Sequence, residues 1–254
     1  MSTPLAQHQV EIHANLKAWQ GKPLLREIYA GFYERIVAQI DTTIPGRIVE
    51  IGSGVGNLKS RLPAAIATDL FPNPWLDLTC DGYELPFRDA SLSHLILFDV
   101  FHHLQKPALF LEEAKRVLGP RGRVILFEPF ISLASYPVYG LLHHEPVAIR
   151  AAIDRSATPP VPKNYYAAQG NATRLFFRGE MPPWPPGWRI RHAEVFAAFA
   201  YLLSGGFSKP AMYPAGALAL LQRCDRWLSR WPGAFGARCL IALQRDAGRV
   251  EREN

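Results

Sequence analysis

A short buried strand that ends in a glycine loop is the feature that most limits how this chain can fold. Residues 47–51, Arg-Ile-Val-Glu-Ile, form a β-branched run, and glycines follow at positions 52, 54 and 56. Such a run is typical of a strand buried within a parallel sheet. Glycine lets the following turn bend tightly and lets its backbone touch a ligand. The pattern predicts a nucleotide-type cradle at the carboxyl end of this strand.

Three later segments repeat the pattern of an apolar run with an acid near its end. They are residues 65–69 with Asp69, residues 95–100 with Asp99 and residues 123–130 with Glu128. An amphipathic helix is predicted at residues 107–118, with Gly119-Pro120 as its stop. Strand, helix and strand in alternation predict a parallel, doubly wound sheet. A carboxylate at the end of the second strand, Asp69, can accept both hydroxyls of a ribose.

Further predicted elements flank this core. They are helices at 5–20, 23–40, 57–62 and 215–231, and strands at 188–196 and 238–245. The expected fold is α/β, a doubly wound, mostly parallel seven-stranded sheet with flanking helices. Residues 1–45 are expected to form an N-terminal helical cap and residues 46–130 a cofactor-binding core. Residues 131–254 are expected to hold substrate-binding loops, a long insertion between the last strands, and the final strands of the same domain.

Composition favours an ordinary globular protein. Hydrophobic residues make up 48% and charged residues 20% of the 254, which argues against disorder. The cysteines Cys80, Cys224 and Cys239 have no CxxC spacing, so neither a disulfide framework nor a zinc site is expected from them. The first residues lack the apolar stretch of a signal peptide, and the longest uncharged apolar stretch, 195–203, is too short to span a bilayer. A cytoplasmic protein is therefore expected.

Charge is unevenly distributed along the chain. Residues 1–130 carry a net charge of −1 and residues 131–254 a net charge of +7. The basic half is suited to an anionic substrate, a phosphate-bearing carrier or a lipid surface, although solvated arginines explain most such excesses. The apolar segment 197–221 suits a lid over a hydrophobic acceptor, a surface that rests on a membrane, or plain packing. Peripheral membrane contact stays open, and the oligomeric state is not indicated.

Five segments of residues 46–130 together resemble a known family. They are VEIGSGVG at 49–56, ATDL at 67–70, CDGYELPF at 80–87, LFDVFHHL at 97–104 and EEAKRVLGPRGRVILFEP at 112–129. In these segments the chain resembles the class I, Rossmann-like S-adenosylmethionine-dependent methyltransferases, in their small-molecule subgroup. The resemblance implies S-adenosylmethionine as the cofactor and methyl transfer as the activity.

The resemblance also implies roles for individual residues. Glu50 would orient the methionine amino group, and the loop with Gly52, Ser53, Gly54 and Gly56 would pass beneath the methionyl and ribose groups. Asp69 would bind the ribose, Leu70 would lie beside the adenine, and Asp81 of the Asp81-Gly82 pair would bind the adenine amino group. Backbone near Phe98 and Asp99 would hold the methionine end, with His103 packed nearby. Asp81 is equally understandable as a turn residue before Gly82.

Two features depart from related patterns. Asn57 stands where a dinucleotide-binding GxGxxG loop has its third glycine. The segment 71–81 is too short and too rich in proline for the helix that usually separates the second and third strands of the family. Pro72 or Trp75 is expected to help wall the adenine pocket instead.

The expected chemistry makes modest demands on the protein. A sulfonium methyl group is already activated, so the enzyme mainly aligns the acceptor and excludes water. An acceptor oxygen of high pKa would need a base, for which His144 and His143 are the candidates, although an exposed surface pair is an equal interpretation. No metal is expected, because the consecutive His143-His144-Glu145 cannot present three side chains on one helix face.

Two other functions are compatible with a glycine loop. One is a non-catalytic binding subunit that keeps the cofactor fold, and the other is an NAD-dependent oxidoreductase, which Asn57 disfavours. Nucleic-acid methylation is disfavoured because Phe98-Asp99-Val100-Phe101 replaces the Asn-Pro-Pro-aromatic tetrad that grips a flipped base. A small-molecule acceptor is expected, and the apolar C-terminal half leads to the hypothesis that it is hydrophobic or lipid-linked.

Overall fold

The computed structural model describes residues 4–142, 145–154, 166–180 and 187–246. Its strands span Arg47–Ile51 (β1), Ile66–Asp69 (β2), Leu78–Thr79 (β3), Leu92–Phe98 (β4), Leu118–Pro129 (β5), Trp188–Phe196 (β6) and Arg238–Arg245 (β7). Its helices span Pro4–Gly21 (α1), Pro23–Val37 (α2), Pro107–Val117 (α3), Ser135–Pro137 (α4), Phe199–Leu203 (α5), Leu218–Leu228 (α6) and Pro232–Phe235 (α7). Short 3-10 turns lie at Asn57–Ser60, Phe101–His103 and Ala215–Ala217, and π turns at Val138–Leu142 and Thr173–Phe177.

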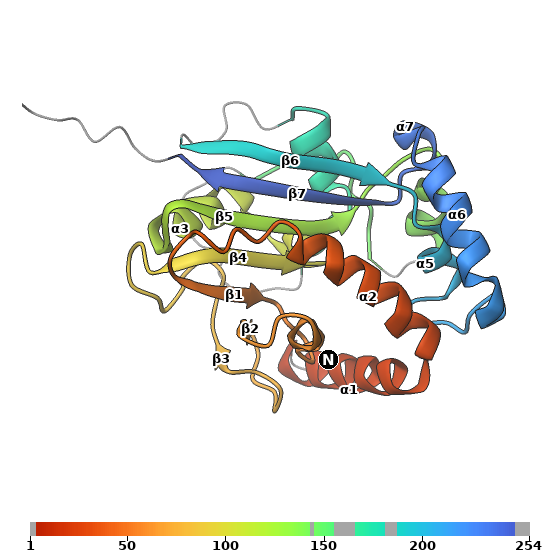
Figure 1. Ribbon diagram of the computed structural model, residues 1–254, viewed down its shortest axis with the longest axis horizontal. Helices are drawn as coiled ribbons and strands as arrows, with labels where there is room; N and C mark the ends of the chain where they lie inside the picture. Colours follow the sequence, from red (N-terminus) through yellow and green to blue (C-terminus); the bar gives the residue numbers. More distant parts are fainter. Residues whose placement is uncertain (1–3, 143–144, 155–165, 181–186, 247–254) are drawn as a thin grey trace, which may run out of the picture.

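The seven strands form one sheet in the order β3-β2-β1-β4-β5-β7-β6. Neighbours from β3 to β5 pair in parallel, and β7 pairs antiparallel with both β5 and β6. The carboxyl ends of β1, β4 and β5 therefore meet at one edge, on the right of Figure 1. This topology confirms the predicted doubly wound, mostly parallel seven-stranded sheet. In such sheets ligands bind outside the carboxyl ends of the strands.

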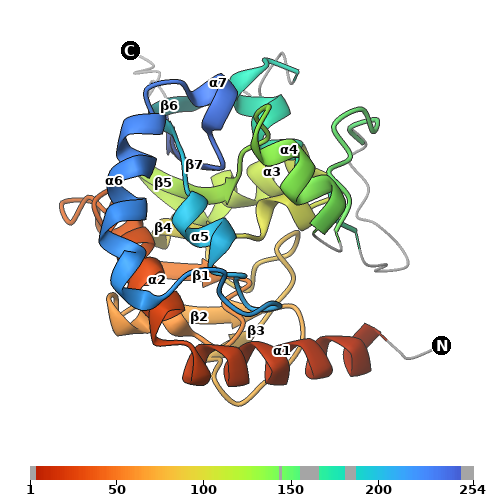
Figure 2. The same cartoon turned by 90° about the vertical axis from the view of Figure 1, so that its right-hand side faces the viewer.

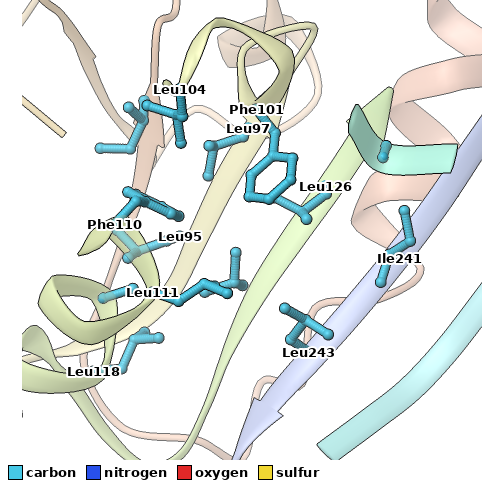
Figure 3. Close-up of a cluster of buried hydrophobic side chains, with 14 of the residues drawn as sticks. Leu95, Leu97, Phe101, Leu104, Phe110, Leu111, Leu118, Leu126, Ile241 and Leu243 are labelled. Atoms are coloured by element: carbon cyan, nitrogen blue, oxygen red, sulfur yellow. The ribbon is translucent and has the colours of Figure 1, made fainter. Parts of the chain in front are cut away.

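Helices cover both faces of the sheet (Figure 2), with α2 and α6 on one side and α3 and α4 on the other. The face under α2 is filled by buried side chains of the helix and strands, among them Leu25, Phe32, Ile36, Ile96, Ile125 and Leu240. The face under α3 is filled by the cluster in Figure 3, which includes Leu95, Leu97, Phe110, Leu111, Leu126 and Ile241. Strands buried on both faces explain why the sequence shows continuous apolar runs instead of alternation.

The predicted flanking elements are confirmed: 5–20, 23–40, 188–196 and 238–245 correspond to α1, α2, β6 and β7. The stop predicted for the helix at Gly119-Pro120 is confirmed, because α3 ends at Val117 and β5 begins at Leu118. One detail of the prediction was wrong. The helix expected at 57–62 is a single 3-10 turn, because Gly56 is left-handed with φ 70° and Pro63 leaves too few residues for a longer helix.

A buried carboxylate fixes α5 against α6. Asp225, on α6 and 8% exposed, accepts the backbone N–H groups of Phe199 at 2.8 Å and Ala200 at 3.0 Å. These groups belong to the first turn of α5, where a helix has no internal acceptors for them. Asp225 thus caps α5 from a distant part of the chain. Ala198, the residue at the N-cap position of α5, has no side chain that could cap the helix.

We predict that Asp225→Ala lowers the free energy of unfolding by about 1–3 kcal/mol, since two buried N–H groups lose their acceptor. Chemical denaturation measures the change. The exposed Glu112 on α3 supplies the control, and Glu112→Ala is expected to change stability by less than about 0.5 kcal/mol. Equal stability of the two variants would contradict the capping role of Asp225.

Candidate active site

A cavity of about 670 Å³ lies at the carboxyl ends of β1, β4 and β5. The glycine loop forms one part of its wall, and the segments after β4 and β5 form another. Further wall comes from α2, from the end of α5 and the residues after it (201–212), and from Arg238 at the start of β7. Its volume is in the range of small-molecule sites.

The glycine loop takes a backbone shape that side chains would disturb. Gly52 has φ +69°, and a Cβ there would lie 2.4 Å from the Val100 side chain. Ser53 pins the loop to β2, because its N–H donates to the Thr68 carbonyl at 2.8 Å and its Oγ accepts the Thr68 N–H at 3.0 Å. The loop therefore offers fixed backbone to a ligand in the cavity.

Glu50 is a buried acid with one oxygen that has no hydrogen-bond partner. Its side chain lines the cavity, the residue is 4% exposed, and Oε2 accepts no hydrogen bond. Burial raises the pKa of Glu50 to about 8, and the nearby Asp69 carboxylate adds to the rise. A buried carboxylate is stable when a cation pairs with it. The amino group of S-adenosylmethionine fits this requirement.

Asp69 joins the end of β2 to the glycine loop. Its Oδ2 accepts the Gly54 N–H at 3.0 Å, and its Oδ1 accepts the Leu70 N–H at 2.7 Å. Two carboxylate oxygens can accept about four hydrogen bonds, so capacity is left for ribose hydroxyls. Asn73 supports the same loop, since its amide donates to the Gly54 carbonyl at 3.0 Å. Trp75 lies beside Gly56, with its carbonyl 3.3 Å from where a Cβ would be.

The predicted cofactor residues fall into two groups. Those that line the cavity are Glu50, Gly52, Ser53, Gly54, Phe98, Asp99 and His103. Those outside its lining are Gly56, Asp69, Leu70, Asp81 and Gly82. Asp81 acts as a turn residue, because its Oδ1 accepts the Tyr83 N–H at 3.0 Å. The assignment of the second group to the adenosine end stays a prediction.

Glu128, at the end of β5, organises the segment that follows β4. It is fully buried, and its Oε1 accepts the N–H groups of Val100 at 2.9 Å and Phe101 at 2.7 Å. Its Oε2 lies 2.6 Å from Nδ1 of His102. The acid thus holds both the backbone and the first histidine of the loop. Sequence reasoning placed Glu128 at a strand end but gave no sign of these partners.

Glu145 faces the two histidines of this loop. Its Oε2 lies 3.3 Å from Nε2 of His102, and its Oε1 lies 3.3 Å from Nε2 of His103. Burial lowers the pKa of His102, but the Glu128 and Glu145 carboxylates outweigh it and raise that pKa to about 10. Burial lowers the pKa of His103, and the charge of His102 lowers it further. The cluster therefore holds one imidazolium and one neutral imidazole at neutral pH.

The predicted bases His143 and His144 lie outside the described residues. Their role stays a prediction. The neighbouring Glu145, which the sequence grouped with them, instead meets His102 and His103. The expectation of no metal concerned the consecutive residues His143-His144-Glu145. The structure instead brings Glu145 to His102 and His103, which come from a separate segment.

Arg238 is a site residue that sequence reasoning missed. It is 1% exposed and its Nη2 donates to Oδ2 of Asp99 at 2.6 Å. The rings of Phe32, Phe98, Phe127 and Tyr201 surround its guanidinium, with centroids 4.9–5.7 Å from Cζ. Burial lowers the pKa of Arg238 while Asp99 raises it well above its usual value, so it stays a cation. Asp99 itself is left-handed, with φ 55°.

Four tyrosines also line the cavity. They are the buried Tyr29 and Tyr33 of α2, the buried Tyr139, and the half-buried Tyr201 of α5. Burial raises the pKa of each hydroxyl, so all four stay neutral at physiological pH. The sequence marked Tyr29 only as one apolar position of a helix.

Comparison with known proteins gives one family match. Residues 49–126 match a family model described as a methyltransferase domain. This part of the chain is thus similar to a methyltransferase domain. The Rossmann-like sheet and this match confirm the predicted resemblance to class I methyltransferases, and the match implies S-adenosylmethionine as the cofactor. No curated protein sequence matches the chain.

Two solved structures of methyltransferases share the fold. A candidate sarcosine dimethylglycine methyltransferase from Galdieria sulphuraria is 14% identical, with 94% of this chain and 98% of that chain covered and a TM-score of 0.51. A candidate histamine N-methyltransferase from Thermotoga maritima is 16% identical, with 93% and 99% covered and a TM-score of 0.51. Identities this low show a common fold and leave the acceptor undetermined.

We predict that the cofactor product S-adenosylhomocysteine releases close to one proton on binding at about pH 6.5. At that pH Glu50, with a pKa of about 8, is protonated in the free methyltransferase domain, and the ligand ammonium lowers its pKa on binding. Calorimetry in buffers of different ionisation enthalpy counts the protons. Glu50→Gln is expected to abolish the release, whereas Glu112→Gln on α3 keeps it. Proton release of the same size by Glu50→Gln would contradict the pairing of Glu50 with the ligand ammonium.

Proposed function

We propose that the protein transfers a methyl group from S-adenosylmethionine to a small acceptor that is hydrophobic or lipid-linked. The observation that carries the proposal is the single cavity described above. It joins Glu50, whose Oε2 has no hydrogen-bond partner, and the glycine loop to the tyrosines and to the His102-His103-Glu145 cluster. One end of the cavity has the groups that suit a charged cofactor, and the other has the walls that suit an acceptor.

The wall formed by α5 and the residues after it supports an apolar acceptor. Tyr201, Leu202, Phe207 and Met212 all line the cavity. Apolar walls of this kind exclude water, and methyl transfer needs alignment and water exclusion more than added reactive groups. The cavity thus combines apolar and aromatic side chains with the polar His102-His103-Glu145 cluster, as ligand sites commonly do.

The sheet order weighs against the NAD-dependent alternative. NAD-binding Rossmann sheets have the order 3-2-1-4-5-6, whereas here antiparallel β7 lies between β5 and β6. The family match is also to a methyltransferase domain. A non-catalytic binding subunit would share both features, so a transfer assay has to distinguish it.

An exposed apolar surface on α6 and on the turn after it supports contact with lipid. Leu220 and Trp227 of α6 are 62% and 54% exposed, and Trp231 in the turn is 47% exposed, with its ring 4.8 Å from that of Trp227. Arg223 of α6 and Arg230 of the turn are also exposed. Aromatic and apolar side chains with arginines in one short segment suit an anionic membrane surface. None of the helices in the described ranges is long and apolar enough to cross a bilayer. We therefore propose contact at the surface.

Methyl transfer is tested with methyl-labelled S-adenosylmethionine and a cell extract that contains small molecules. We expect label in the organic-solvent fraction, and loss of about ten-fold or more in kcat/KM for Asp69→Ala, which removes acceptors for ribose hydroxyls. Asp77→Ala is the matched control, because Asp77 also accepts a strand N–H, that of Ala67 at 2.8 Å. Its kcat/KM should match the wild type.

Two results would count against this proposal. Label confined to the aqueous fraction would contradict a hydrophobic or lipid-linked acceptor. Label no higher than in a protein-free control, from a protein that binds S-adenosylhomocysteine, would contradict methyl transfer and favour the non-catalytic subunit.

Lipid contact is tested by sedimentation with vesicles that contain anionic phospholipid. We expect the Trp227→Ala/Trp231→Ala variant to lose about ten-fold in partitioning, since two interfacial aromatic rings are removed. Ile190 on β6 is 44% exposed and supplies the control, and Ile190→Ala should partition as the wild type does. Equal partitioning of all three proteins, or partitioning that salt does not weaken, would contradict the proposed surface.

A further inference from the structure

The His102-His103-Glu145 cluster brings three ligating side chains to one point. The ring nitrogens and the carboxylate oxygens that face one another lie within 4.8 Å. The two imidazole rings have centroids 4.2 Å apart. Both histidines come from the 3-10 turn Phe101–His103, whereas Glu145 comes from the segment that follows the π turn Val138–Leu142.

Each member of the cluster is oriented by a second group. Nδ1 of His102 lies 2.6 Å from Glu128, and Nδ1 of His103 lies 2.9 Å from the Tyr166 carbonyl. Gln169 donates from Nε2 to Oε2 of Glu145 at 3.1 Å. Histidines that bind metals almost always donate their other nitrogen to a carboxylate or a carbonyl in this way. The arrangement around the cluster is thus the one that supports metal ligands.

Hydrogen positions point to a cation between His103 and Glu145. A carbonyl oxygen only accepts, so Nδ1 of His103 carries the hydrogen that bonds to Tyr166. In the neutral ring the lone pair is then on Nε2, which faces Oε1 of Glu145 at 3.3 Å. Two electron-rich atoms at that distance repel unless a proton or a metal cation lies between them.

The distances suit a metal cation. Two ligand atoms about 2.1 Å from one ion at a tetrahedral angle lie about 3.4 Å apart. Both measured nitrogen–oxygen distances in the cluster are 3.3 Å. In the absence of an ion, the His102 imidazolium hydrogen-bonds to Glu145 through Nε2, and an ion that binds at Nε2 displaces this proton.

We propose that His102, His103 and Glu145 form a binding site for a divalent transition-metal ion, with Zn²⁺ the best match. Two imidazoles and one carboxylate suit Zn²⁺ and its first-row neighbours, whereas Mg²⁺ and Ca²⁺ prefer oxygen ligands alone. Three protein ligands leave an open position for another molecule.

The site faces the acceptor part of the cavity, since all three ligands line it. The role of the ion, but not the existence of the site, rests on the proposed methyl transfer. An oxygen of the acceptor, as a hydroxyl, an enol or a carboxylate, would take the open position. The ion would then fix that oxygen and lower the pKa of a hydroxyl. A methyltransferase acceptor with an oxygen donor is therefore the expected ligand class.

The site is tested by treating the full chain with a chelator and then titrating it with Zn²⁺ against a chromophoric competitor. We expect one equivalent to bind, with the affinity reduced about 100-fold in His103→Ala and in Glu145→Gln. His192→Ala is the matched control, because His192 lies 3.6 Å from Glu194 on the sheet edge and should not alter binding. Binding of S-adenosylhomocysteine by each variant verifies that the cofactor half is folded. Co²⁺ should give an absorption band that Glu145→Gln loses.

The outcomes separate the site from the proposed function. Absence of equimolar Zn²⁺ uptake, or equal uptake by the wild type and Glu145→Gln, would overturn the site. Methyl transfer that persists unchanged after chelation would overturn the role of the ion while leaving the methyltransferase proposal intact. Equimolar Zn²⁺ uptake that Glu145→Gln weakens supports the site whether or not a methyl acceptor has been found.

Discussion

The buried carboxylate of Glu128 is the constraint on which the active-site region depends. It accepts the amides of Val100 and Phe101 and contacts the His102 ring, so one acid at the end of β5 fixes the turn that follows β4. That turn closes over Gly52, whose missing side chain leaves room for Val100. Without Glu128, buried backbone N–H groups would lack an acceptor, at a cost of about 1–3 kcal/mol each. The glycine loop and the histidine cluster therefore share one support.

A second charge pair ties the end of the sheet to the same place. The buried Arg238 of β7 reaches the half-buried Asp99 after β4, within a cage of aromatic rings. Removing Asp99 would leave the buried Arg238 cation without its carboxylate, which is destabilising. The antiparallel β7 thereby contributes to the site as well as to the core. Together the two pairs explain how segments distant in sequence form one continuous cavity wall.

The sequence predicted the sheet because its strands are buried on both faces, and β1, β6 and β7 lie where apolar runs predicted them. It missed β3, whose two residues carry no periodicity, and it expected a helix where Pro63 allows only a turn. In the site, Glu50 and the glycine loop were predictable because the motif is local. Arg238 and the contacts of Glu145 were not, since each pairs with residues far along the chain and nothing in the local pattern marks them.

If one cavity holds the cofactor at Glu50, the reactive end of the cofactor should face the histidine cluster. A crystal structure with S-adenosylhomocysteine bound would show whether it does. We expect the amino group of the ligand within hydrogen-bond distance of Glu50 and its sulfur facing His102, His103 and Tyr201. An amino group placed away from Glu50, or a sulfur turned away from the cluster, would contradict this expectation.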